Sequence, residues 1–158
     1  MPRIELHTEI NAPIDICFDL SRSIDLHKES MLHTKEEAVA GKTSGLIEDG
    51  ESVTWQAKHF GVTQFLTSKI SNLKRPYIFR DSQTKGIFNF FHHDHVFEEI
   101  NGKTLLTDIF EYQSPLGILG KLADFLFLKS YMTKLLEQRN KVIKEYAESD
   151  KWKKILSV

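Results

Sequence analysis

The sequence contains few of the residues that mark well-known chemical centres. Its single cysteine, Cys17, excludes a disulfide within the chain and leaves no cysteine pair for a zinc site. Cys17 stands among apolar residues of an expected short helix, so we predict a buried, inert thiol there. A phosphate-binding glycine motif and the glycine-flanked serine of a nucleophile elbow are also missing. The sequence therefore does not support nucleotide-binding or serine hydrolase chemistry.

Neither sign of charge is in excess, and no long apolar run is present. The chain has 21 basic and 22 acidic residues and a formal net charge of -1, which provides no general attraction to nucleic acid, and we expect no such partner. The most apolar stretch, residues 122–128, is too short to span a bilayer. Because residues 1–5 lack the apolar core of a signal peptide, we expect a cytoplasmic location.

The length and composition are typical of one globular domain. The 158 residues are 41% hydrophobic and 27% charged, which is sufficient for a single core. We expect one domain over residues 1–149 and a frayed tail over 150–158, although Trp152 is apolar enough to pack back onto the domain. The expected state is a monomer or a weak homodimer.

Alternating residues and turn signals predict strands around two short helices. Residues 3–10 alternate as a half-buried strand. Pro13 and Asp15 predict the start of a short helix, and Ser23 predicts the N-cap of a second one. Further strands are expected at residues 35–40, 51–59, 62–70 and 77–83, with a tight turn at residues 60–61 that places Trp55, His59 and Leu66 on one inner face.

The most informative segment is a hairpin that carries polar residues on an apolar face. If residues 101–102, Asn-Gly, form a type I′ turn, the pairing of the two strands follows. Two histidines and one aspartate then share a face with aromatic residues and a leucine. The predicted pairs are Phe97 with Leu106, His95 with Asp108, His93 with Phe110 and Phe91 with Tyr112.

After this hairpin the apolar spacing becomes helical. Ser114 and Pro115 are a plausible cap and first-turn proline, and an amphipathic helix is expected from residue 116 to about residue 148. Gly117 and Gly120 are expected to loosen its first part. The run at residues 125–128 is apolar on more than one helix face, so it could be buried by the sheet, cover a cavity mouth, contact a membrane surface or make a dimer contact.

These elements predict an α+β fold in which a curved antiparallel sheet of about seven strands wraps around the long C-terminal helix. Only that helix is long enough to cover the apolar face of the sheet. Side chains do not always fill the space between a curved sheet and the helix that it grips, and such an arrangement often encloses a cavity.

The order of elements and several segments resemble the START-like, Bet v 1-type helix-grip proteins, also called the SRPBCC or polyketide cyclase-like superfamily. The segments that carry the resemblance are residues 9–18, 53–61, 91–97 and 107–117. Residues 55–61 and 93–95 are similar to a bacterial subgroup, some members of which have been labelled cell-division inhibitors. The resemblance implies an internal cavity for a hydrophobic small molecule but does not identify that molecule.

We predict that the polar residues of the hairpin, together with its aromatic neighbours, contact a ligand. Asp108, opposite His95, is expected to fix the tautomer of that histidine and raise its basicity. His92 and Asp94 face the other side and are expected to be solvated, as are His7, His27 and His33. The predicted ligand-binding residues are Trp55, His59, Leu66, Phe91, His93, His95, Asp108, Phe110 and Tyr112.

Other interpretations of the same residues remain open. The histidines and Asp108 are also compatible with a purely structural polar network, or with catalysis in which His95 and Asp108 act as a general base. With His59 they could supply the nitrogen and oxygen ligands that zinc accepts. No cysteine joins the set and the resembling proteins generally work without a metal, so we expect no metal and no cofactor.

The sequence thus favours a binding protein for a hydrophobic small molecule of lipid, polyketide or isoprenoid type, held between the sheet and the C-terminal helix. One alternative is an enzyme of the cyclase or dehydratase type, acting on a carbonyl compound through a histidine–aspartate pair. A second alternative is a protein-interaction or cell-division-related regulatory module that uses the apolar start of the long helix.

Overall fold

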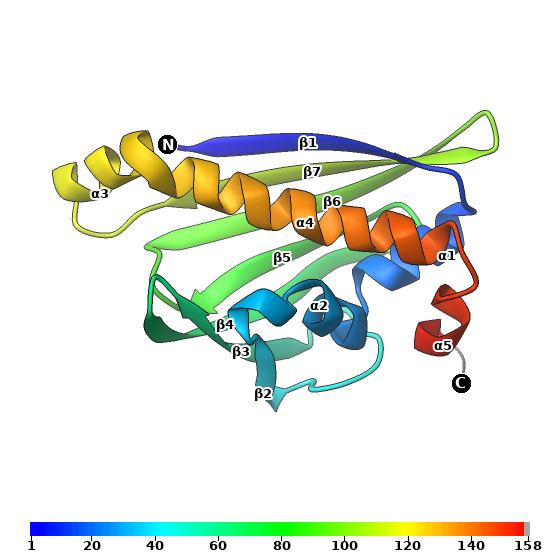
Figure 1. Cartoon of the computed structure of the whole chain (residues 1–158), viewed down its shortest axis with the longest axis horizontal. Coiled ribbons are helices and arrows are strands. Elements are labelled where there is room, and N and C mark those ends of the chain that lie inside the picture. The colour runs from blue at the N-terminus through cyan, green and yellow to red at the C-terminus, as the bar shows by residue number, and fades with distance from the viewer. Residues whose placement is uncertain (157–158) are drawn as a thin grey trace.

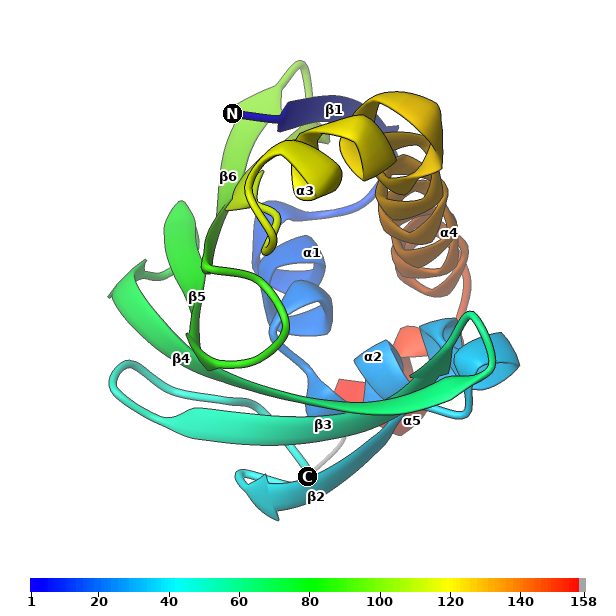
Figure 2. The same cartoon turned by 90° about the vertical axis from the view of Figure 1, so that its left-hand side faces the viewer.

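The computed structural model describes residues 1–156, which form one curved sheet wrapped around a long helix (Figures 1 and 2). The seven strands are antiparallel and lie in the order β1-β7-β6-β5-β4-β3-β2. Their bounds are β1 Arg3–Ile10, β2 Glu37–Gly41, β3 Ser52–His59, β4 Val62–Lys74, β5 Ile78–Lys85, β6 Phe90–Ile100 and β7 Lys103–Gln113. The helices are α1 Ile14–Ser21, α2 Ile24–Ser30, α3 Ile118–Ala123, α4 Lys129–Ala147 and α5 Trp152–Leu156, with a 3₁₀ turn at Leu32–Thr34 and a π-helical segment at Asp124–Leu128.

The β6–β7 hairpin has the predicted register. Asn101 and Gly102 have φ angles of 51° and 78°, as a type I′ turn requires at both central residues. Phe97 pairs with Leu106, and the other three predicted pairs follow in the same register. Because side chains alternate across a strand, this register directs His93, His95 and Asp108 to the concave face of the sheet.

The β3–β4 hairpin is also as predicted. Trp55 pairs with Leu66 and His59 pairs with Val62, so the turn consists of Phe60 and Gly61. Both turn residues have positive φ angles, 52° for Phe60 and 76° for Gly61. A left-handed conformation is uncommon for a bulky residue, and the Phe60 side chain at this turn is exposed.

The C-terminal helix differs from the prediction at its start. Ser114 and Pro115 lie outside the helix, which begins at Ile118 with Gly117 as its N-cap. Gly120 packs so closely on the carbonyl of Pro115 that a Cβ would not fit, so this glycine tightens the entry to the helix instead of loosening it. The loosened part is the π-helical segment Asp124–Leu128, which has wider turns than an α-helix.

Aromatic residues hold the sheet against the two N-terminal helices. The ring of Phe18 on α1 lies 5.4 Å from that of Phe79 and 5.2 Å from that of Phe97, with both pairs edge-on. The predicted Ser23 cap is confirmed, since its hydroxyl accepts a hydrogen bond from the backbone of Leu26. Cys17 is fully buried, and burial raises the pKa of its thiol to about 11, which agrees with an inert cysteine.

Residues 152–156 form helix α5, so the expected frayed tail is wrong for this part, and residues 157–158 of that expectation lie outside the described residues. Helix α5 lies beside α1 at one end of the molecule (Figure 1), and the expected packing of Trp152 onto the domain is confirmed. In the described part of the chain, residues 1–156, no helix is long and apolar enough to cross a membrane.

Two neighbouring leucines on β7 test which face of the sheet carries the core. Leu106 is fully buried, whereas Leu105 on the opposite face is only half-buried. We expect Leu106→Ala to lower the free energy of unfolding by about 2–5 kcal/mol, because it leaves a cavity in a packed core, and Leu105→Ala by less than about 1 kcal/mol. Urea unfolding followed by circular dichroism measures both, and equal losses would contradict the assigned faces.

Candidate functional site

A cavity of about 360 Å³ lies between the concave face of the sheet and helices α2, α3 and α4. Most of its wall is apolar, which allows the cavity to accept a hydrophobic molecule without leaving many polar groups unpaired. Its larger apolar wall residues include Trp55, Leu66, Phe91, Phe110, Met132 and Leu136.

The cavity opens where three segments expose apolar side chains. The view along the long helix in Figure 2 shows this end of the molecule, with α3 lying across it. Residues that both line the cavity and are strongly exposed come from the β3–β4 hairpin, the β5–β6 loop and the region around the start of α3. They are Phe60, Phe65, Ile87, Leu116 and Leu119, which we call the rim.

Beside the rim, the outer face of α3 and the π-helical segment is apolar. Phe125 is 87% exposed, and Leu126 and Phe127 are also exposed, so the possibility that the sheet buries this run is wrong for these three residues. Leu128, the last residue of the run, is half-buried and lines the cavity. Phe127 contacts the rim, because its ring centre lies 5.8 Å from that of Phe60. The same Phe60 ring lies 4.5 Å from the ring of Tyr131 on α4.

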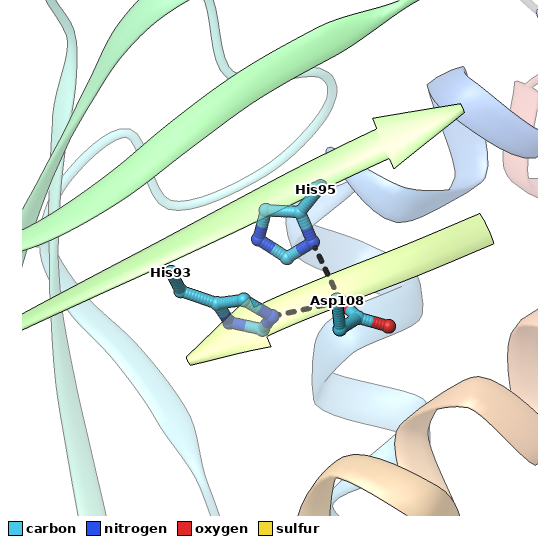
Figure 3. A group of neighbouring side chains, drawn as sticks. All are labelled: His93, His95 and Asp108. Atoms are coloured by element: carbon cyan, nitrogen blue, oxygen red, sulfur yellow. Dashed lines mark hydrogen bonds and ion pairs between the residues drawn. The ribbon is translucent and has the colours of Figure 1, made fainter. Parts of the chain in front are cut away.

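The polar wall of the cavity is built around the buried carboxylate of Asp108 (Figure 3). His93 and His95, both on β6, point toward Asp108 on β7. The Nε2 atom of His93 donates a hydrogen bond of 2.7 Å to Oδ1 of Asp108, and Nδ1 of His95 lies 3.2 Å from the same oxygen. The two imidazole rings lie 3.8 Å apart and cover the carboxylate on the cavity side.

Two residues of α4 complete this network. The side-chain amide of Asn140 donates a hydrogen bond of 2.6 Å to Oδ2 of Asp108. Arg139 donates hydrogen bonds to the side chain of Asn140 and to the backbone carbonyl of Ser21, and its Nη1 atom lies 3.7 Å from Oδ1 of Asp108. A buried carboxylate is stable only with such partners, so this network ties the sheet to the long helix.

The burial and charges of the network shift the pKa values of its members. Burial lowers the pKa of His95 well below its ordinary value, helped by the neighbouring His93 and Arg139 and opposed by Asp108. Burial alone would raise the pKa of Asp108, but the contacts from His93 and His95 outweigh it and hold that pKa well below its usual range. Asp108 is therefore ionised and His95 is neutral near pH 7. Asp108 does raise the pKa of His95, as expected, but burial outweighs this effect and the net pKa is lowered.

A second polar group lies on the cavity wall toward the β3–β4 hairpin. The Nδ1 atom of His59 lies 2.6 Å from the hydroxyl of Tyr131, and His27 pairs with Glu36 at 2.7 Å while its ring packs on Trp55. Burial lowers the pKa of His59, against the opposing charge of Glu36. His27 was expected to be solvated, and this expectation is wrong because α2 turns its ring toward the cavity.

Seven of the nine predicted ligand-binding residues line the cavity. The expectation of ligand contact is corrected for Asp108, which lies behind the imidazoles of His93 and His95, and for Tyr112, which is fully buried beside Phe88. The residues on the cavity wall are Trp55, His59, Leu66, Phe91, His93, His95 and Phe110. Of the two residues of β6 that were expected to face solvent, His92 is exposed, and Asp94 forms an ion pair of 2.7 Å with Arg80.

The sequence interpretation missed several polar residues of the cavity wall. Asp81 shares the inner face of β5 with Phe79, and the alternation of that strand would have indicated it. Glu36 precedes β2 directly and carried no such signal. Arg139 and Tyr131 stand among many polar residues of the long helix, where the sequence does not show which charged side chain faces inward.

The buried histidines and Asp108 have the donor atoms of a metal site. Their closest ligand atoms all lie within 4.8 Å of one another. However, the guanidinium of Arg139 already lies 3.7 Å from the carboxylate oxygen that a metal ion would share. A fixed positive charge at this place opposes a divalent cation, so the residues fit a hydrogen-bonded network better than a metal centre.

Comparisons with known proteins find the architecture in solved structures at low sequence identity. No protein-family model and no curated protein sequence matches the chain. TTHA0849 from Thermus thermophilus has a TM-score of 0.75 at 19% identity, and the match covers 92% of this chain and 97% of that chain. Ara h 8.0201 has a TM-score of 0.70 at 13% identity, with the same coverage of 92% and 97%. A START superfamily protein from Mycobacterium smegmatis has a TM-score of 0.70 at 12% identity, again covering 92% and 97%.

The seven-stranded sheet curved around α4 defines a helix-grip fold. More particularly, the fold is that of the START and Bet v 1 type, as the resemblance of the sequence predicted. At these identities the comparisons establish the fold, and the activity has to be inferred from the cavity and its residues.

The lowered pKa of His95 predicts a pH dependence of stability. When the pH falls below about 6.5, the unfolded chain binds a proton at this histidine that the folded protein does not, so the free energy of unfolding falls. One such proton contributes at most about 1.4 kcal/mol per pH unit. We expect His95→Gln to reduce the slope of the free energy of unfolding against pH between pH 7 and pH 5. Part of the slope should remain, because the pKa of His59 is also lowered.

The control is His92→Gln, because His92 is exposed on the other face of the same strand. Urea unfolding at several pH values measures the slopes. The His92 variant should keep the slope of the unmodified protein, and an unchanged slope in the His95 variant would contradict the assigned pKa shift.

Proposed function

We propose that the protein binds a hydrophobic small molecule of lipid, polyketide or isoprenoid type, with a polar group of that molecule directed toward His93 and His95. The observation that carries the proposal is an apolar cavity of about 360 Å³ with a buried polar cluster on one wall. This volume is within the usual range for small-molecule sites, roughly 300–1,000 Å³.

The division of the wall into apolar and polar parts supports an amphiphilic ligand. Trp55, Leu66 and Phe110 offer aromatic and aliphatic surface, and burial of a ligand against them removes apolar area from water. His93 and His95 are held in place from behind by Asp108, so they are oriented before a ligand arrives. Such preorganisation lowers the entropic cost of binding.

The rim supports entry of an apolar molecule from one end of the cavity. Phe60 and Leu116 are 60% and 77% exposed, and both also line the cavity. An apolar ligand would therefore meet apolar side chains continuously from the opening to the interior. The contact of Phe60 with Tyr131 narrows this opening in the described structure.

A substitution that fills the cavity tests the proposal. Ala57 is buried on the cavity wall, and its neighbour Lys58 is exposed on the other face of β3. We expect Ala57→Phe to weaken binding of the neutral fluorescent probe N-phenyl-1-naphthylamine at least tenfold, because the new ring occupies the binding volume. Lys58→Phe, which adds the same ring outside the cavity, should leave the affinity unchanged.

Fluorescence titration measures both affinities, and circular dichroism verifies that the variants are folded. If the probe binds the Ala57 variant as tightly as the unmodified protein, it binds elsewhere and the proposed site is wrong. Native mass spectrometry of the protein from its own host, followed by organic extraction, would then identify the natural ligand.

One observation favours the alternative of an enzyme. His93, on the cavity wall, donates a hydrogen bond of 2.7 Å to a buried carboxylate, an arrangement that suits a general base. The pairing differs from the expected one, in which His95 was the base. If this alternative holds, 2-nonanone in deuterated buffer should exchange its α-protons faster with the protein than without it.

This exchange is followed by proton NMR. His93→Gln should remove the acceleration, whereas His92→Gln on the outer face should keep it. Exchange at the rate of buffer alone, with the ketone shown to be bound, would contradict a general-base role for His93.

A further inference from the structure

Two polar atoms of the cavity wall are buried without a hydrogen-bond partner among residues 1–156. They are Nε2 of His95 and Oδ1 of Asp81. Both residues line the cavity, and they come from adjacent strands. A buried polar atom without a partner costs free energy, and on the wall of a binding cavity a ligand can supply that partner.

The contacts of His95 assign the position of its proton. Its Nδ1 atom accepts a hydrogen bond of 3.3 Å from Nη2 of Arg139. Oδ1 of Asp108 lies 3.2 Å from the same nitrogen, but its hydrogen bond of 2.7 Å comes from His93. Because His95 is neutral and its Nδ1 acts as an acceptor, its one proton is on Nε2. The free Nε2 atom is therefore a donor.

Asp81 provides the complementary acceptor. It pairs directly with His93 across β5 and β6, and the next inward pair along the two strands is Phe79 with His95. Asp81 and His95 are thus diagonal neighbours on one face, a relation that brings Cβ atoms within roughly 7–8 Å. A carboxylate oxygen accepts hydrogen bonds, so the two unpartnered atoms are one donor and one acceptor.

We propose that Asp81 and His95 select a ligand whose polar group is a hydroxyl, which both donates and accepts a hydrogen bond. This inference rests on the proposed function and narrows its ligand to neutral amphiphilic alcohols or phenols. The hydroxyl donates to Oδ1 of Asp81 and accepts from Nε2 of His95. Neither contact requires the network around Asp108 to change.

The charges of the wall disfavour the two common charged alternatives. A ligand carboxylate would approach Asp81, with Asp108 close behind. The two guanidiniums of the wall are already engaged, that of Arg139 by three hydrogen bonds and that of Arg22 by Asp19, Glu48 and the carbonyl of Ile47. A ligand ammonium can donate to Asp81, but it cannot accept from Nε2 of His95, and it would also meet the charge of Arg139. Only a group that is neutral and bifunctional satisfies both free atoms.

Paired ligands of equal chain length test this selection. Isothermal titration calorimetry at pH 8 compares 1-decanol with decanoate, which differ mainly in the polar group. We expect the unmodified protein to bind 1-decanol at least about tenfold more tightly, because the carboxylate lacks a donor and faces Asp81. Asp81→Asn keeps the shape and an acceptor oxygen but removes the charge, and it should tighten decanoate binding about tenfold.

Asp94→Asn is the matched control, since Asp94 is an aspartate on the outer face of the adjacent strand. It should leave the preference for the alcohol unchanged. Nitrogen-15 NMR of the histidines gives a second readout, in which His95 should be protonated on Nε2, and its Nε2 signal should shift when 1-decanol is added.

The outcomes separate this inference from the proposed function. If N-phenyl-1-naphthylamine binds but decanoate is preferred, or neither decyl ligand binds, or Asp81→Asn leaves the preference unchanged, the selection by Asp81 is wrong while cavity binding stands. A proton on Nδ1 of His95 also overturns it. If the probe and both decyl ligands fail to bind, the proposed function is wrong as well.

Discussion

The structure depends on one buried charge, the carboxylate of Asp108. It is fully buried and is held by hydrogen bonds from His93 and Asn140, with His95 and Arg139 also close. These partners come from the sheet and from α4, so the carboxylate fixes the distance between the two main parts of the fold. The cavity exists beside this fixed point, because the aromatic side chains around it cannot close the remaining space.

The same network determines what the cavity offers to a ligand. By accepting from His93 and lying close to Arg139, Asp108 neutralises charge that would otherwise face the interior. On the cavity wall, Nε2 of His95 and Oδ1 of Asp81 remain as polar atoms without a partner among the described residues. The imidazole rings that line the cavity thus lie between the ligand space and Asp108, the carboxylate that holds the sheet to α4.

The features that depend on local geometry, such as the strand register, were predictable from the sequence. The features that depend on the packing of distant elements were not. The Asn101–Gly102 turn and the alternation of the strands were sufficient for the register of β6 and β7. They placed Asp108 opposite His95 correctly, but the short hydrogen bond to Asp108 comes from His93, and Nδ1 of His95 contacts Arg139 of the long helix. Which residues of the long helix face inward depends on how it docks on the sheet, so Arg139 could not be chosen among its many polar neighbours.

The network also constrains the order of folding. Its members are spread over more than 100 positions of the chain, from the backbone carbonyl of Ser21 to the guanidinium of Arg139, which are separated by 118 residues. During synthesis the strand that carries Asp108 leaves the ribosome before α4 does. Before α4 is synthesised, Asp108 lies in the apolar face of the sheet without the neighbouring Arg139. We therefore expect the sheet to adopt its stable curved form only after α4 has docked on it.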